Sequence, residues 1–306
     1  IRTNGMPEKR AELRLVVNAG SILEDEDQRG LAHFVEHMAF NGTKNFPKRE
    51  LVNYLQSVGL RFGPHLNAST SFDETVYLLQ IPTNDSKVLE QAFQVLEDWA
   101  HNVSFDAEEI EKERGVIIEE WRLGLGAQAR LADKEYPILF RGSRYAERLP
   151  IGQKAVLDAF QHDTLKRFYR DWYRPDLMAV IAVGDFDRAR VEGLIRQYFS
   201  RIPPVEKARE RTVYPVPDHK ETLFSIATDP EAPLSAVEIV YKQDVRKTET
   251  VGAYRQRLVE ALAAGMLNQR LSDLTNKPDS PFLFGFSGQG HFVRSKDVFL
   301  IVAVAR

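Results

Sequence analysis

The chain has 306 residues, of which 43% are hydrophobic and 28% charged, and its formal net charge is −3. This length allows two domains, each with its own core. The slightly acidic balance argues against nucleic acid or an anionic membrane surface as the main partner, and no apolar run reaches the roughly 20 residues of a membrane-spanning helix. Because there are no cysteines, any bound zinc must be held by histidine and carboxylate side chains.

The first 60 residues predict a strand and two helices. Residues 11–20 form an apolar run that predicts a buried strand, and the acidic run 24–28 predicts a solvent-exposed loop. A helix is expected from residue 30 to Asn41-Gly42, where glycine can adopt the left-handed conformation that ends helices. Pro47 predicts the start of a second helix, over 48–58.

The next elements are strands followed by helices. Two strands are expected within 60–68 and 74–81, joined by turn residues at 69–73. Apolar side chains at helical spacing predict a helix over 85–102, and an acidic first turn predicts another over 106–124. After an irregular stretch that contains Pro137, the expected elements are helices at 154–160 and 163–172, a strand at 177–184 and a helix ending near 198.

The domain boundary is expected at residues 201–220, which are rich in proline and charge. The elements expected beyond it are strands near 221–228 and 236–242, a helix over 248–274, and strands near 282–292 and 297–305. Their order repeats that of 11–82 without the histidines. We therefore expect an α+β fold of two related domains, 1–210 and 211–306, each a mostly antiparallel sheet with packed helices, the second of them truncated.

The stretch 30–43 reads GLAHFVEHMAFNGT and contains the pattern HxxEH. On a helix, at roughly 100° per residue, His33 and His37 lie about 40° apart, and Glu36 lies about 60° to the other side of His33. Two imidazoles and a carboxylate on one face suit a zinc ion with an acid–base group beside it, the inverzincin arrangement. The alternative is a pair of histidines on a solvated helix, which their apolar neighbours disfavour.

A catalytic zinc site needs a third protein ligand, and the acidic helix after residue 106 is its best source. Glu113 and Glu120 lie about 20° from the same direction on a helix, and Glu109 joins their stripe. Glu119 points roughly 100° away from Glu120, so both cannot face the metal equally well. The alternative for these residues is a charged helix face that pairs with neighbouring lysine and arginine.

These features together resemble the pitrilysin/insulinase family of inverzincin peptidases, and most closely its bacterial PqqL-like branch. The resemblance rests on HFVEH at 33–37, ERGVIIEE at 113–120, NASTSFDETVY at 67–77 and RDWYRP at 170–175. The distinctive motifs of this resemblance lie within about residues 10–200, and the rest of the chain resembles the family more loosely. It implies the fold of pitrilysin and mitochondrial processing peptidase, in which two such halves close on the substrate as a clamshell.

The resemblance also implies roles for individual residues. The zinc ligands would be His33, His37 and Glu120, with Glu119 as the alternative third ligand. Glu36 would be the general base, and Glu113 would support the site by orienting a ligand histidine. The resemblance further implies an exposed strand edge that binds an extended peptide. This edge consists of Asn67, Ala68, Ser69 and Thr70. The alternative is a plain hairpin with no contact to substrate.

The sequence therefore predicts a zinc-dependent endopeptidase that acts on peptides or unfolded segments. We expect the 306 residues to need a second clamshell half for full activity. A non-catalytic peptide-binding or assembly subunit is the main alternative, which the intact Glu36 disfavours, and a metal-dependent hydrolase of another substrate class is disfavoured by the resemblance alone. The same resemblance implies a periplasmic or otherwise exported protein.

Overall fold

In the computed structural model of the protein, residues 1–48, 50–246 and 248–305 are described. The chain divides into two compact units, of which the first comprises Ile1–Leu123 and Arg148–Thr212. The second comprises Gly124–Glu147 and Val213–Arg306. The segment 124–147 therefore belongs to the second unit, although the sequence placed it in the first domain.

The first unit is built on a five-stranded sheet with the order β1-β5-β2-β4-β3. All neighbours pair antiparallel except β1 and β5, which pair parallel. The strands are β1 (Arg2–Thr3), β2 (Arg10–Val17), β3 (Leu66–Thr70), β4 (Thr75–Pro82) and β5 (Met178–Gly184). Every second residue of β2 and β4 is buried, and these form the middle of the core: Ala11, Leu13, Leu15, Val17, Tyr77, Leu79 and Ile81.

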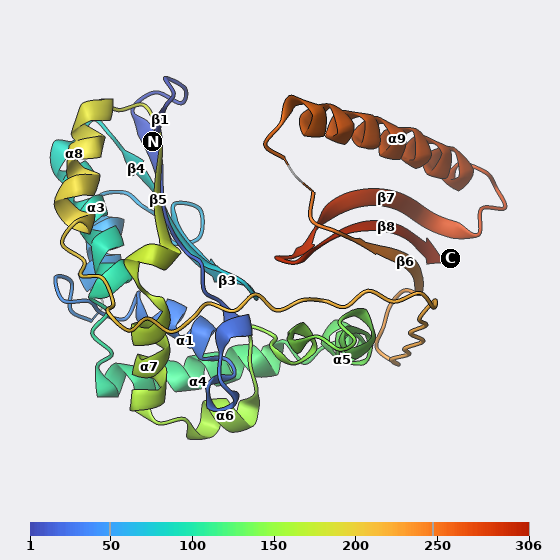
Figure 1. The fold of residues 1–306 in the computed structure, drawn as a ribbon, viewed down its shortest axis with the longest axis horizontal. Helices are drawn as coiled ribbons and strands as arrows, with labels where there is room; N and C mark the ends of the chain where they lie inside the picture. The colour runs from blue at the N-terminus through green and yellow to red at the C-terminus, as the bar shows by residue number, and fades with distance from the viewer. Residues whose placement is uncertain (49, 247, 306) are drawn as a thin grey trace. The chain divides into compact units, whose positions relative to one another are not determined.

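The helices of the first unit form two groups around this sheet (Figure 1). They are α1 (Leu31–Met38), α2 (Glu50–Ser57), α3 (Ser86–His101), α4 (Ala107–Leu123), α6 (Lys154–Ala159), α7 (His162–Trp172) and α8 (Arg188–Phe199). In one group, α3 packs on β2 and β4, and α8 packs on α3. In the other, α1 lies between the strand β3 and the helices α4 and α7. This second group places α1 where side chains from β3 and α4 can meet it.

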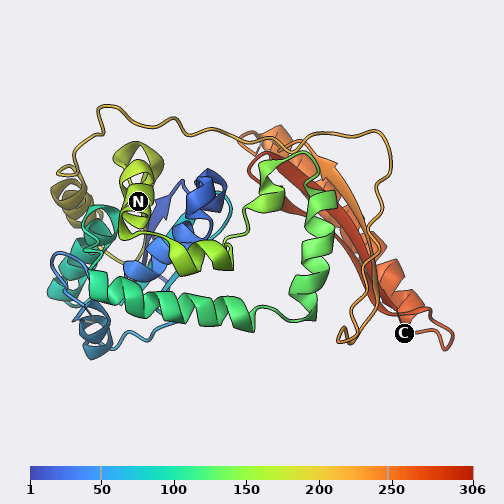
Figure 2. The ribbon, with the colours of Figure 1, turned by 90° about the horizontal axis from the view of Figure 1, so that it is seen from below.

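The second unit contains a three-stranded antiparallel sheet with the order β6-β8-β7. Its elements are α5 (Ala127–Leu139), β6 (Ala236–Gln243), α9 (Val251–Thr275), β7 (Phe282–Val293) and β8 (Lys296–Ala305). The long helix α9 packs on β7, and α5 lies beside the sheet (Figures 1 and 2). The Nζ of Lys242 in β6 donates to the Leu139 carbonyl at the end of α5, at 2.9 Å.

The two units repeat one topology. In the first, β2, the helices α1 and α2, β3 and β4 follow one another along the chain and give the strand order β2-β4-β3. In the second, β6, α9, β7 and β8 give the corresponding order β6-β8-β7. The predicted α+β fold of two related domains with mostly antiparallel sheets is therefore confirmed.

Three expected elements differ in the structure, and a fourth is described only in part. The stretch around Pro137 is helical, because proline lies only in the last turn of α5 after a run of good helix formers. The strand expected within 60–68 is confined to Leu66–Thr70, since Gly63-Pro64 lies in a turn. Residues 221–228 form no strand, and no described strand pairs with them. The helix expected over 48–58 begins at Glu50, and Arg49 lies outside the described residues.

Candidate metal centre and active site

Helix α1 turns its two histidines toward the site and buries the rest of its surface. The side chains of His33 and His37 are 14% and 23% exposed. The other six residues of the helix are all buried: Leu31, Ala32, Phe34, Val35, Glu36 and Met38. A helix this short cannot be stable by itself, so its packing fixes the direction of both imidazoles.

The N-terminus of α1 is capped by Glu24. Its carboxylate accepts hydrogen bonds from the backbone N–H of Gly30, at 3.0 Å, and of Ala32, at 2.8 Å. A negative charge there also favours the helix dipole. Glu24 is fully buried, so the prediction that residues 24–28 form a solvated loop is wrong for this residue. The carboxylate is needed because the first N–H groups of a buried helix have no partner within the helix.

Two glycines allow another loop to reach the start of α1. Gly30 has a φ of 102° and Gly152 a φ of 77°, both in the left-handed region. A Cβ on Gly152 would lie 2.3 Å from the Gly30 Cα, which no side chain can tolerate. This close approach brings Pro150 and Ile151 to the rim of the site.

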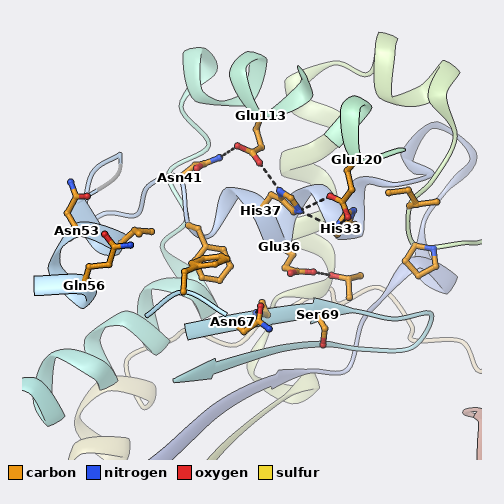
Figure 3. Close-up of a pocket in the computed structure, with 17 residues that line it drawn as sticks. His33, Glu36, His37, Asn41, Asn53, Gln56, Asn67, Ser69, Glu113 and Glu120 are labelled. Atoms are coloured by element: carbon orange, nitrogen blue, oxygen red, sulfur yellow. Dashed lines mark hydrogen bonds and ion pairs between the residues drawn. The ribbon is translucent and has the colours of Figure 1, made fainter. Parts of the chain in front are cut away.

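Three ligand-type atoms from α1 and α4 converge (Figure 3). The Nε2 atoms of His33 and His37 are 3.1 Å apart. The Glu120 carboxylate lies 3.8 Å from the first and 3.6 Å from the second. Donor atoms roughly 2.0–2.1 Å from a tetrahedral zinc ion are about 3.3 Å from one another. Two imidazoles and one carboxylate at these separations therefore fit zinc, with one coordination position left for water or substrate.

The structure brings Glu120 to the histidines and turns Glu119 away from them. The Glu119 carboxylate pairs instead with Arg122, which donates from Nε at 2.8 Å. Glu109 is buried and pairs with Lys112 at 3.0 Å, so it takes no part in the site although it lies on the same stripe. The geometry thus favours Glu120 over the alternative third ligand.

Glu113 lies behind His37, as Figure 3 shows. Its Oε1 is 2.7 Å from the His37 Nδ1, which leaves Nε2 of that ring to face the ligand cluster. Its other oxygen accepts a hydrogen bond from the Asn41 side chain. A carboxylate in this position fixes the orientation and tautomer of a ligand histidine. Nothing in the sequence marks Asn41 as a site residue, because Asn41-Gly42 indicates only the end of the helix.

The pKa values in the site are shifted by burial and by neighbouring charges. Burial lowers the pKa of His33 to about 4, helped by the adjacent His37. Burial also lowers the pKa of His37, but the hydrogen bond with Glu113 and the nearby carboxylates outweigh it, so that this pKa is raised. Burial raises the pKa of Glu36, although a hydrogen bond from Thr70 favours its ionised form. His33 is therefore neutral near pH 7 and can act as a ligand.

The edge strand β3 lies alongside the site. It pairs with β4 on one side only and is the last strand of its sheet. With α1, α2 and α4 it lines a pocket of about 770 Å³. Asn67 and Ser69 are exposed on the strand, and Ala68 and Thr70 are half-buried. His65 precedes the strand in a turn, where its Nδ1 accepts the Arg61 N–H at 3.2 Å, and it does not join the ligand cluster.

Comparisons with known proteins match both units. A model of the insulinase family (peptidase family M16) matches residues 2–131, and a model of the peptidase M16 inactive domain matches residues 159–280. A protein from Arabidopsis thaliana named "Zinc protease PQQL-like" is 42% identical over 283 residues, which are 92% of this chain and 30% of that protein. The chain thus spans about a third of the length of the curated relatives it matches first.

Comparison with solved structures also finds proteases that are similar to this chain. The first half of the periplasmic protease PqqL from Escherichia coli has a TM-score of 0.89 and 30% identity, covering 99% of this chain and 65% of that one. The ferredoxin protease FusC, in a mutant form in complex with Arabidopsis ferredoxin, has a TM-score of 0.81 and 26% identity, covering 99% of this chain and 34% of that one. None of the described helices combines the length and apolar character needed to cross a bilayer.

Proposed function

The chain belongs to the pitrilysin/insulinase family of peptidases, peptidase family M16, and to its PqqL-like branch, and on this basis we propose that it forms the metal-binding part of a zinc-dependent endopeptidase. The observation that carries the proposal is the convergence of His33, His37 and Glu120 within 4.8 Å of one another. Zinc held there would polarise the scissile carbonyl and activate a water molecule.

The chain's own residues supply the rest of the chemistry. Glu36 would accept a proton from the attacking water and return it to the leaving amine. Its burial suits this role, because a raised pKa lets a carboxylate both take and give a proton near neutral pH. Glu113 would hold His37 in the orientation that presents Nε2.

The substrate would be an extended peptide or an unfolded protein segment. The outer edge of β3 can pair with such a segment through backbone hydrogen bonds, which bind peptides without reading their sequence. We assign this contact to Asn67, Ala68, Ser69 and Thr70. The relative FusC is described in complex with a ferredoxin, a protein substrate class that is compatible with this proposal.

Two further parts of the proposal concern the whole protein. The chain spans 30% of its Arabidopsis relative, so we propose that a second clamshell half, on the same polypeptide or a partner subunit, completes the active site. Residues from that half would help to hold the substrate and to stabilise the oxyanion. We also propose export to the periplasm, which the description of Escherichia coli PqqL supports.

The competing function is a peptide-binding or assembly subunit without catalysis. A binding subunit has no use for a carboxylate held beside a metal site, and Glu36 is held there at 7% exposure. This placement favours the enzyme.

The test is Glu36→Gln, with Glu192→Gln on the surface of α8 as the matched control. We expect Glu36→Gln to retain zinc and to lower peptide hydrolysis by about 10²- to 10⁴-fold, because the proton acceptor is lost. The measurement is hydrolysis of a quenched fluorescent peptide by the chain alone and with its second half, beside the zinc content of each variant. Unchanged hydrolysis by Glu36→Gln would rule out this mechanism.

A further inference from the structure

The hydroxyl of Thr70 contacts the carboxylate of Glu36. Thr70 is the last residue of β3, and its Oγ1 lies 2.5 Å from the Glu36 Oε2. Such a short contact between a hydroxyl and a carboxylate is a charge-assisted hydrogen bond, in which the hydroxyl donates and the carboxylate accepts. The side chain of Thr70 is therefore directed at Glu36, even though its backbone belongs to the edge strand.

The other hydroxyl near Thr70 makes a longer contact than the Glu36 carboxylate does. Its neighbour across the hairpin is Thr75, with the two Oγ1 atoms 3.4 Å apart. Thr75 is fully buried, and its hydroxyl donates to the Ala19 carbonyl at 3.0 Å. Because each hydroxyl has one proton, the proton of Thr70 goes to the carboxylate and that of Thr75 to the carbonyl.

Two buried tyrosines hold Thr75 in place. The hydroxyl oxygens of Tyr77 and Tyr173 are 2.8 Å apart, and the Tyr173 hydroxyl also hydrogen bonds with Thr75. Tyr77 is fully buried and Tyr173 is 4% exposed. Thr75, Tyr173 and Tyr77 thus form a chain of buried hydroxyl groups. Because Thr75 pairs with Thr70 across the hairpin, these buried contacts support the end of β3 on which Thr70 lies.

We propose that Thr70 is a positioning residue for Glu36, its hydroxyl holding Oε2 so that Oε1 is the oxygen free to take a proton from the attacking water. This inference rests on the proposed function and assigns the Thr70 side chain to the base rather than to the substrate. A misplacement of a catalytic group by about 1 Å can cost roughly 100-fold in rate. A positioning residue therefore affects kcat, whereas a side chain that binds substrate in the ground state affects KM.

The kinetic test compares variants with and without the hydroxyl. We expect Thr70→Val and Thr70→Ala to lower kcat by about 10- to 100-fold at unchanged KM and unchanged zinc content, and Thr70→Ser to restore kcat to within about threefold. Thr83→Val is the matched control, because Thr83 Oγ1 donates to the Asp185 carbonyl away from the site. A raised KM with unchanged kcat, or failure of serine to restore kcat, would overturn the proposal.

A structural readout separates this inference from the proposed function. In crystal structures of the chain prepared without metal, we expect Glu36 to keep one conformation in wild type and Thr70→Ser, and to leave it in Thr70→Val and Thr70→Ala. An unmoved Glu36 in both hydroxyl-free variants would overturn the positioning role even if peptide hydrolysis is observed. A moved Glu36 in a chain that hydrolyses no peptide would support the positioning contact while the proposed enzyme fails.

Discussion

The two repeats of this chain share a topology and differ in the helix that follows their first strand. In the first repeat α1 is eight residues long, and six of its residues are buried. In the second, α9 is 25 residues long, and none of its described residues is buried. The sheet orders β2-β4-β3 and β6-β8-β7 are the same.

The same strand order therefore does not by itself produce the same chemistry. In the first repeat, α1 is enclosed by β3, α4 and α7, so its polar residues meet Glu113, Glu120 and Thr70 from other elements. In the second, β7 is the only described element with which α9 makes extensive contacts, and α9 carries no histidine. A functional site forms where side chains from several elements meet at one helix face, and the strand order alone does not create it.

The first comparison concerns zinc affinity and Glu113, the carboxylate that orients His37. Glu113→Gln should weaken zinc binding by about 10- to 100-fold, because His37 loses the carboxylate that orients it. The matched variant in the second repeat is Glu260→Gln on α9, which removes the partner of Arg246 and should leave zinc binding unchanged. Competition with a fluorescent zinc chelator measures both. Equal affinities for Glu113→Gln and Glu260→Gln would contradict the comparison.

A second comparison concerns stability and the caps of the two helices. Glu24→Ala should lower the free energy of unfolding by about 2–4 kcal/mol, because buried N–H groups of Gly30 and Ala32 lose their acceptor. Thr250→Ala should cost only about 1 kcal/mol, since Thr250 caps the exposed α9 through the Ala253 N–H. Urea unfolding followed by circular dichroism measures both. A larger loss for Thr250→Ala than for Glu24→Ala would show that burial of α1 is not what makes its cap important.

A third comparison concerns the pH dependence of zinc binding. Zinc needs the neutral imidazole, and the raised pKa of His37 means that a proton competes for this ring already above its ordinary value of about 6.5. His33, with a pKa of about 4, does not compete until much lower pH. The zinc affinity should therefore fall by about tenfold for each pH unit below the His37 pKa. Titrations between about pH 8 and pH 5 measure this slope, and a slope of two protons would contradict it.

The sequence predicted the parts of the site that are local. The spacing of His33, Glu36 and His37 fixes their common helix face, and the family resemblance supplied Glu113 and Glu120 from a second helix. Asn41 and Glu24 could not be found in this way, because their roles depend on where α4 and the start of α1 lie in space. The exposed loop predicted at Glu24 was wrong for the same reason, since acidic composition does not reveal a buried acceptor.

The fold was predicted best where the pattern is regular. The order of β2, α1, β3 and β4 and its repeat in the second unit follow from hydrophobic periodicity and turn residues. Helix α5 does not follow from the local pattern, because Pro137 indicates a break although it lies only in the last turn, after a run of helix formers. The strand expected at 221–228 has the apolar composition of a strand, but a strand also requires a partner, which no local pattern provides.

The central claim is that His33, His37 and Glu120 form a zinc site, and metal content tests it most directly. The measurement is zinc per chain by mass spectrometry after dialysis against a weak chelator, for wild type, Glu120→Gln and Glu119→Gln. We predict one zinc ion per chain for wild type and Glu119→Gln, and substantial loss for Glu120→Gln, because the Glu120 carboxylate lies within 3.8 Å of both imidazoles whereas Glu119 pairs with Arg122. Loss of zinc from Glu119→Gln alone, or no zinc in wild type, would contradict the account.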